Sequence, residues 1–126
     1  FNNFKIIEIN SSKTKKNNAI EIKKIESENI LKNIKKNDLL FLLDEKGKNY
    51  DSREFAEFLK IKFQESKTIV FVIGGAFGFS KDLYSKSVGL ISLSKMTFSH
   101  QIIRLFFTEQ LYRAFTILNN HPYHND

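Results

Sequence analysis

The sequence contains no cysteine, which excludes a disulfide framework and a thiolate metal site and is compatible with a reducing compartment. It also contains no secretory signal and no apolar run long enough to span a membrane, so we expect a soluble, cytoplasmic protein. Arginine is scarce, because Arg53, Arg104 and Arg113 stand beside seventeen lysines. Most of the positive charge is therefore carried by strongly hydrated ammonium groups rather than by planar guanidinium groups suited to bidentate recognition.

The residues that are present predict one packed domain. The chain has 126 residues, which is the length of a single domain, and its 41% hydrophobic content with thirteen Phe supplies an ample core. The formal net charge is +6. A basic balance of this size is typical of proteins that bind nucleic acid, but equally of proteins that are merely soluble.

Apolar runs and helical patterns alternate along the chain and predict an α/β fold. Three runs that are apolar at nearly every position predict strands covered on both faces. They are Leu39–Leu43, Thr68–Ile73 and Val88–Leu93, with a further strand candidate at Phe4–Ile9. Helices are predicted at Ala19–Ile34, after the capping box of Asp51 and Glu54, from Ser80, and at Ser99–Leu118. We therefore expect a parallel-rich sheet with right-handed crossovers and helices on both faces.

Three strand ends are candidates for a ligand site, because open α/β sheets bind ligands beyond the carboxyl ends of their strands. They are Leu43-Asp44, Gly74-Gly75 and Leu93–Phe98. We expect Asp44–Gly47 to form a turn that closes the first strand. The glycines let a ligand approach the main chain without meeting a Cβ, although a tight turn that only frees the strand end would explain them as well. No Gly-Lys-Ser/Thr follows, which excludes a P-loop, and no Gly-x-Gly-x-x-Gly is present, which argues against a nicotinamide cofactor.

The predicted helix Ser99–Leu118 is apolar over more of its surface than one buried stripe requires. More than half of its circumference is covered by Ile102, Ile103, Phe106, Phe107, Leu111, Ala114, Ile117 and Leu118. In a chain this small, we expect a partner subunit to cover the excess apolar surface. A central helix that is wholly buried within a monomer is the alternative.

Polar residues on this helix and beyond it are candidates for contact with a ligand. Arg104 and Arg113 can bind a phosphate or a carboxylate bidentately, and an internal ion pair with Glu109 is the alternative. Tyr123 and His124 belong to a tail without apolar periodicity, which suits stacking on, or hydrogen bonding to, an unstacked RNA base. The two histidines of this tail are spaced by three, but no carboxylate or thiolate cluster accompanies them, so we predict no metal site.

The segment Ile73-Gly-Gly-Ala-Phe-Gly78 and the last third of the chain, from Ile91 through Leu93-Ser-Lys-Met-Thr-Phe98 to the ending His121-Pro-Tyr-His124, resemble the RlmH family of SPOUT-class methyltransferases. These enzymes use S-adenosylmethionine to methylate a pseudouridine of the large ribosomal RNA. The resemblance implies a C-terminal trefoil knot in which three loops hold the cofactor. Carried over residue by residue, it assigns cofactor binding to Leu43, Gly74, Leu93, Ser94, Lys95, Met96, Thr97 and Phe98.

The same resemblance implies the chemistry and the partners. A sulfonium cofactor is already activated, so catalysis consists mostly of aligning the methyl donor with the acceptor nitrogen and of helping to remove the acceptor's proton. We assign this help to Tyr123, His124 and Arg113, and RNA binding to His100, Arg104, Tyr123 and His124. The expected protein is a homodimer with its site near the interface. Its expected substrate is N3 of a pseudouridine in the 23S ribosomal RNA of the assembled ribosome, without a metal or a membrane.

Two other functions stay open beside this one. The chain could be a non-catalytic RNA- or ribosome-binding module that has kept the fold, or a SPOUT enzyme that acts on tRNA. Binding of the cofactor separates the first alternative from the enzymes. We expect residues 1–126 to form a single SPOUT methyltransferase domain, and we expect the family's first strand, glycine-containing loop and helix to be missing ahead of Phe1.

Overall fold

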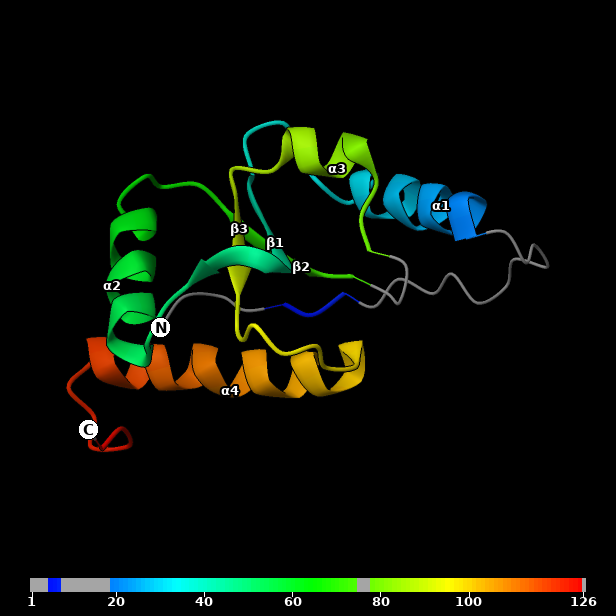
Figure 1. Cartoon of the computed structure of the whole chain (residues 1–126). Helices are drawn as coiled ribbons and strands as arrows, with labels where there is room; N and C mark the ends of the chain where they lie inside the picture. Colours follow the sequence, from blue (N-terminus) through cyan, green and yellow to red (C-terminus); the bar gives the residue numbers. More distant parts are fainter. Residues whose placement is uncertain (1–4, 8–18, 75–77, 126) are drawn as a thin grey trace.

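The computed structural model describes residues 5–7, 19–74 and 78–125. Within them, three parallel strands form one sheet in the order β2-β1-β3, which confirms the predicted α/β class. The elements follow one another as α1 (Ala19–Leu31), β1 (Leu39–Asn49), α2 (Ser52–Phe63), β2 (Ile69–Ile73), α3 (Lys81–Lys86), β3 (Gly89–Ser92) and α4 (His100–Leu118) (Figure 1). The strand predicted at Phe4–Ile9 lies largely outside the described residues, and its described part, residues 5–7, forms no strand.

Helices cover both faces of the sheet, as the apolar runs predict. Successive strand residues point to opposite faces, so Phe41 joins a buried cluster with Phe55 of α2 and Phe107 of α4. On the other face, Leu42 is fully buried in a second cluster with Leu83 of α3 and partly buried side chains of α1. Figure 1 shows α1 and α3 on one side of the sheet and α4 on the other. Burying a side chain of this size stabilises the fold by about 1.5–3 kcal/mol.

The helix starts follow local side-chain chemistry. Asp51 accepts a hydrogen bond of 2.8 Å from the backbone N–H of Glu54, and the Glu54 carboxylate accepts one of 2.8 Å from the backbone N–H of Asp51. This is the predicted capping box of α2. Ser80 and Ser99 cap α3 and α4 more simply, because the hydroxyl oxygen of each accepts one backbone N–H of the first turn and no reciprocal bond is formed. All three starts are set by residues within one turn of the helix, which is why the sequence predicts them well.

The turn predicted at Asp44–Gly47 is wrong, because β1 continues through these residues to Asn49. Leu43 and Lys48 both stand opposite Ile91 of β3, so the pairing of β1 with β3 shifts its register between them. A Cβ on Gly47 would lie only 2.6 Å from the backbone nitrogen of Ile91. The glycine therefore permits two strand backbones to approach at an irregularity in the ladder, and it does not end the strand.

Candidate functional site

β2 ends beside Leu43 in β1, and β3 ends one residue after Ile91, which also lies beside Leu43. In the sheet, Leu43 of β1 is level with Ile73 of β2 and with Ile91 of β3. Gly74 and Leu93 directly follow the ends of β2 and β3, as predicted, whereas Asp44 follows Leu43 within β1, which does not end there but continues to Asn49. The structure thus brings the candidate cofactor residues from distant parts of the sequence to one edge of the sheet, although Gly75 lies outside the described residues.

The loop that follows β3 is held by short polar contacts. The hydroxyl of Ser92 donates to the carbonyl oxygen of Ser94 at 2.8 Å, and the hydroxyl oxygen of Ser94 accepts the backbone N–H of Met96 at 3.0 Å. The hydroxyl of Thr97 donates to the carboxylate of Glu45 at 2.8 Å, which ties the loop to β1. Lys95 to Phe98 are all exposed. The loop therefore has a defined shape and still offers its side chains to a ligand.

Asp44, at the same edge, is engaged by α3. The hydroxyl of Tyr84 donates a hydrogen bond to the Asp44 carboxylate. Burial, together with this hydrogen bond and the negative charge of Asp44, raises the pKa of Tyr84 to about 12. Sequence reasoning missed Tyr84 and Glu45, because both act through contacts across 40 or more residues of sequence.

Position 74 requires glycine, because any side chain there would collide with packed protein. A Cβ built there would lie 2.8 Å from two ring atoms of Phe79, whose side chain is buried in the core beside α3. The side of Gly74 that a larger residue would fill is therefore occupied by protein. A ligand at this edge meets Gly74 through its N–H and C=O groups, so a substitution such as Gly74→Val disturbs Phe79 as well as any ligand.

The C-terminal tail folds back onto α4 through a helix-ending motif. Asn120 has a φ of 57°, the backbone N–H of Asn120 donates to the carbonyl oxygen of Ile117 at 3.2 Å, and that of His121 donates to the carbonyl oxygen of Thr116 at 2.8 Å. This pair of bonds is the Schellman motif, with asparagine in place of the usual glycine in the left-handed position. The reversal places Tyr123 and His124 against the helix they follow.

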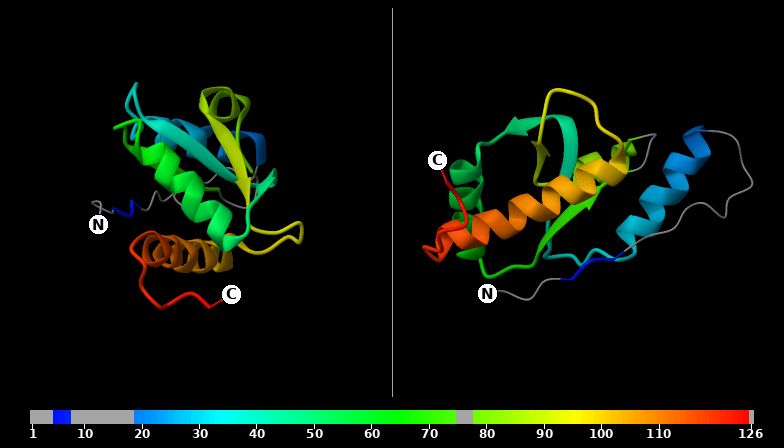
Figure 2. Two further views of the ribbon diagram at one scale, coloured as in Figure 1. Left: turned by 90° about the vertical axis from the view of Figure 1, so that its left-hand side faces the viewer. Right: turned by 90° about the horizontal axis from the view of Figure 1, so that it is seen from below.

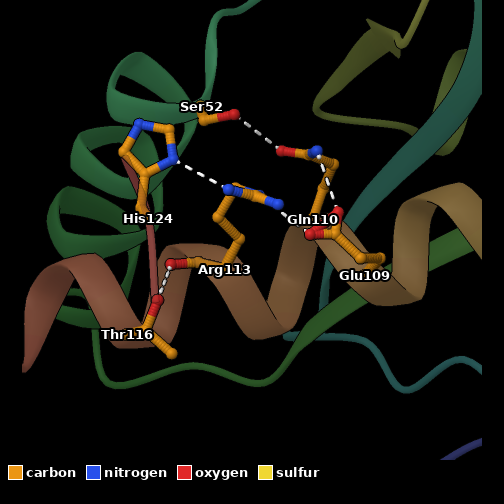
Figure 3. A network of polar contacts seen from close by, with 6 residues as sticks. All are labelled: Ser52, Glu109, Gln110, Arg113, Thr116 and His124. Carbon is orange, nitrogen blue, oxygen red and sulfur yellow. Dashed lines mark hydrogen bonds and ion pairs between the residues drawn. The ribbon is translucent and has the colours of Figure 1, made fainter. Parts of the chain in front are cut away.

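Arg113 is the centre of the contacts that hold this tail (Figure 3). Its Nε donates to the Glu109 carboxylate at 2.8 Å, and its Nη1 lies 3.0 Å from Nδ1 of His124. Its guanidinium carbon lies 4.9 Å from the centre of the Tyr123 ring, close enough for a cation–π contact. The ion pair with Glu109, one of two alternatives left open by the sequence, is present, and it leaves Arg113 able to contact both predicted tail residues.

The cofactor candidates and the tail lie apart within one chain. His100 and Arg104 stand exposed in the first turns of α4, next to the loop after β3, whereas Arg113 lies thirteen residues beyond His100. At 1.5 Å per residue, that separation is about 20 Å along the helix axis. Figures 1 and 2 show the tail at the far end of α4 from this loop. The structure therefore assembles each half of the predicted site but does not join them in a single chain.

The apolar surface of α4 is only partly covered. Phe107, Leu111 and Ala114 are buried, but Leu105 is 68% exposed and Phe106 is 44% exposed. Ile102 and Tyr112 are exposed as well. A helix wholly buried within a monomer, the alternative that the sequence left open, is thus excluded for this chain.

The described residues hold no group of three or more His, Asp or Glu side chains arranged to bind a metal ion. Within the same part of the chain, no helix is both long and apolar enough to cross a membrane.

Comparison with known proteins finds methyltransferases. A family model described as a predicted SPOUT methyltransferase matches residues 1–124. A protein of Christiangramia forsetii named ribosomal RNA large subunit methyltransferase H is 51% identical over 114 residues, which are 90% of this chain and 73% of that protein. Proteins of the same name from Flavobacterium psychrophilum and Parabacteroides distasonis are 58% and 54% identical, each over 82% of this chain. This chain spans 66% and 67% of the length of those two relatives.

Proposed function

The chain belongs to the SPOUT methyltransferase family, and on that premise we propose that it methylates the RNA of the large ribosomal subunit, as its RlmH relatives are named to do. The methyl donor in this proposal is S-adenosylmethionine, and the acceptor is N3 of a pseudouridine in the 23S ribosomal RNA of the assembled ribosome in the cytoplasm. The observation that carries the proposal is the strand register, because it places Leu43 beside the ends of β2 and β3 and so brings three separate candidate segments together.

The residues at this edge fit a cofactor that has an apolar ring system and a polar chain. Leu43 and Leu93 are half-buried apolar side chains there. Ser94, Lys95 and Thr97 add polar groups, and Gly74 adds its main-chain N–H and C=O groups. When bound, the cofactor supplies a methyl group on a sulfonium centre whose thioether leaves neutral, so the protein needs no acid to protonate a leaving group. The task left to these residues is to hold the methyl group in line with the acceptor nitrogen.

Tyr123, His124 and Arg113 are the proposed residues for contact with the base. Tyr123 is 40% exposed and packs edge-on against Tyr112, with ring centres 4.9 Å apart, so it offers an aromatic surface fixed on its other side. Stacking of an unpaired base on such a ring contributes about 1–3 kcal/mol. His100 and Arg104 are exposed at the start of α4, next to the loop after β3, and in this proposal they contact RNA phosphates.

A homodimer accounts for the separation between the two halves of the site. Because the tail lies about 20 Å along α4 from the loop after β3, we propose that the tail of one subunit reaches the cofactor edge of the other. The exposed apolar residues of α4, Ile102, Leu105 and Phe106, supply a surface for that association. We propose further that the C-terminal segment is threaded as a trefoil knot around this edge, as the family resemblance implies.

Methyl transfer to purified ribosomes tests the function directly. With methyl-labelled cofactor, the label should enter 23S RNA, and mass mapping should place it on one pseudouridine.

Met96→Pro removes the N–H that holds the loop to Ser94 at an exposed position, and it should abolish cofactor binding by calorimetry. Met96→Ala keeps that N–H and should lose less cofactor affinity. Ribosome binding without cofactor binding would support the non-catalytic module, and label in tRNA alone would support the tRNA enzyme.

Subunit mixing tests the shared site. Homodimers of Met96→Pro lack the cofactor edge and homodimers of His124→Ala lack the tail, so each should be inactive. After unfolding and joint refolding, half of the dimers should be mixed, and one of the two sites in each mixed dimer combines an intact edge with an intact tail. Activity should therefore return to about one quarter of wild type, which follows from the two-fold symmetry of the dimer. A site built within one chain would give no recovery.

A further inference from the structure

The guanidinium of Arg113 lies between a carboxylate and an imidazole (Figure 3). Glu109 accepts from Nε at 2.8 Å, and Nδ1 of His124 lies 3.0 Å from Nη1. The Tyr123 ring lies against the guanidinium carbon. These three contacts fix both the position and the plane of the guanidinium group.

The chemistry of the two side chains decides which atom carries the hydrogen in the contact between Arg113 and His124. A guanidinium has five N–H donors and no acceptor, and it does not lose its charge in proteins. Nδ1 of His124 can therefore take part only as an acceptor, with its lone pair directed at Arg113. In a neutral imidazole one nitrogen is the acceptor and the other carries the hydrogen. His124 is thus held as the tautomer with its hydrogen on Nε2.

This tautomer is the opposite of the one that a histidine base needs. Where a carboxylate contacts Nδ1 directly, it holds the hydrogen on Nδ1 and leaves the lone pair of Nε2 ready to accept a proton. Here the guanidinium of Arg113 stands between the Glu109 carboxylate and the imidazole of His124. The hydrogen bond at Nδ1 therefore runs in the opposite direction from that in a carboxylate-held histidine base. Nδ1 accepts, and Nε2 carries the hydrogen and donates.

Nε2 lies on the side of the His124 ring away from Arg113 (Figure 3). His124 lines an open hollow of about 400 Å³ together with Asp51, Ser52 and Arg53 at the start of α2. Ser52 itself is held by a hydrogen bond of 2.9 Å from its hydroxyl to the amide oxygen of Gln110 on α4. The imidazole is therefore held on its Arg113 edge, and the same side chain forms part of the lining of this hollow.

We propose that Arg113 is a positioning residue that presents His124 to the RNA base as a hydrogen-bond donor, through Nε2–H, to a carbonyl oxygen beside the methylated nitrogen. This inference rests on the proposed function. N3 of a uracil-type ring stands between two carbonyl groups, so the negative charge that forms as N3 loses its proton spreads onto their oxygens, where a fixed donor stabilises it. The N3 proton passes to water, the bond from N3 to the methyl carbon forms as the bond from sulfur to that carbon breaks, and the electron pair of the broken bond stays on sulfur.

Substitutions that keep or remove the donor test this role. In His124→Gln the side-chain amide nitrogen takes the place of Nε2 and donates, but it cannot act as a base. This variant should keep a kcat for ribosome methylation within about tenfold of wild type. His124→Asn, whose shorter amide matches Nδ1, and His124→Ala should both lose about 100-fold or more, the usual loss when such a donor is removed. His121→Gln, the same change at an exposed position three residues earlier, is the matched control and should leave kcat unchanged.

A histidine base would give a different pattern. His124→Gln would then be as inactive as His124→Ala while still binding S-adenosylmethionine, and the pH profile of kcat would lose a limb that the wild type has. Either result would overturn the proposal. If the donor role holds, the pH profile of His124→Gln should keep the shape of the wild-type profile.

Nitrogen NMR of the full-length homodimer determines the tautomer of His124 independently of the methylation assay. With histidine labelled at both ring nitrogens, His124 should show a protonated Nε2 and an unprotonated Nδ1. A hydrogen found on Nδ1 would refute the inference even if ribosomes are methylated.

Arg113→Lys cannot donate to Glu109 and His124 in one plane. It should lower kcat about tenfold or more, while KM for ribosomes and the affinity for cofactor stay within about twofold of wild type. Loss of affinity or folding alone would make Arg113 merely structural. Failure of the wild type to methylate ribosomes would refute the proposed function, while the NMR result still decides the tautomer.

Discussion

Gly47→Ala should destabilise the protein far more than Gly89→Ala, although both replace a glycine in the paired strands β1 and β3. A Cβ on Gly47 would lie 2.6 Å from the backbone nitrogen of Ile91 and from the carbonyl carbon of Leu90. A Cβ on Gly89 would meet only the ring of Phe41, at 3.6 Å, which is an ordinary contact. Neither glycine has a positive φ in the left-handed region, so the comparison isolates the steric clash.

The expected difference in the free energy of unfolding follows from which atoms the added Cβ would contact. Overpacking costs about 1–3 kcal/mol when side chains can shift. At Gly47 the obstacle is strand backbone, so we expect about 3 kcal/mol, at the upper end of that range. For a chain of this length, 1 kcal/mol corresponds to about 4 °C in Tm, which gives a fall of about 12 °C. Gly89→Ala should change the free energy of unfolding by no more than about 0.5 kcal/mol.

Urea and thermal denaturation at one fixed protein concentration measure this, because the stability of a dimer depends on concentration. Gly47→Ala should also weaken cofactor binding, since the approach of β1 to β3 at Gly47 sets the path of Asp44 and Glu45 beside the proposed cofactor site. Equal stabilities for the two variants would refute the reasoning. That result would mean that β1 does not run beside β3 beyond Leu43.

Three further outcomes are expected. Leu105 is 68% exposed on α4, and Leu105→Glu should yield a folded monomer by sedimentation. The control Ile20→Glu, at a position 75% exposed on α1, should remain dimeric. A dimeric Leu105→Glu would exclude this face of α4 as the interface. Because the pKa of Tyr84 is raised to about 12 from its ordinary value of 10.0, the native protein holds a proton that the unfolded chain loses near pH 10. The stability advantage over Tyr84→Phe in urea denaturation should therefore be complete below pH 10 and shrink toward pH 12, and a constant advantage would contradict it. Asn120, with φ 57°, should tolerate Gly with little change in Tm, whereas Asn120→Ala should cost about 1 kcal/mol, and equal effects would argue against the Schellman turn.

Local patterns predict most of the elements of this fold. Strands that are apolar at every position, such as Leu39–Leu43, need a cover on both faces, and the parallel sheet between two helix layers provides it. The capping box at Asp51 marks the start of α2 to the residue. The meeting of the candidate segments is predictable in part, because parallel strands run side by side in one direction, but β1 continues to Asn49 and does not end at Leu43. The assignment of individual residues to the cofactor stays a prediction.

Features that depend on distant partners could not be predicted from the sequence. Asp44–Gly47 has the composition of a turn, and only the backbone of β3, more than forty residues later, makes Gly47 part of a strand. The tail gives no hint that it folds back, because that reversal depends on the positive φ of a single asparagine, Asn120. The position of His124 beside Arg113 follows from this reversal. Sequence reasoning proposed both residues for the site, which stays a prediction, but it did not predict their contact.

Under the proposed function, general attraction of RNA and recognition of one nucleotide are carried by different residues. A dimer would have twice the net charge of +6 of one chain, and most of that charge belongs to lysines. Such a field attracts RNA phosphates without regard to sequence, and salt screens it over about 8 Å at physiological ionic strength. Choice of one nucleotide requires fixed geometry instead, and the cluster of Arg113, Tyr123 and His124 has it through contacts of 3.0 and 4.9 Å. Loss of lysines should therefore weaken binding to all RNA in a salt-dependent way, whereas loss of Arg113 should lower the rate at the correct nucleotide even where binding is unchanged.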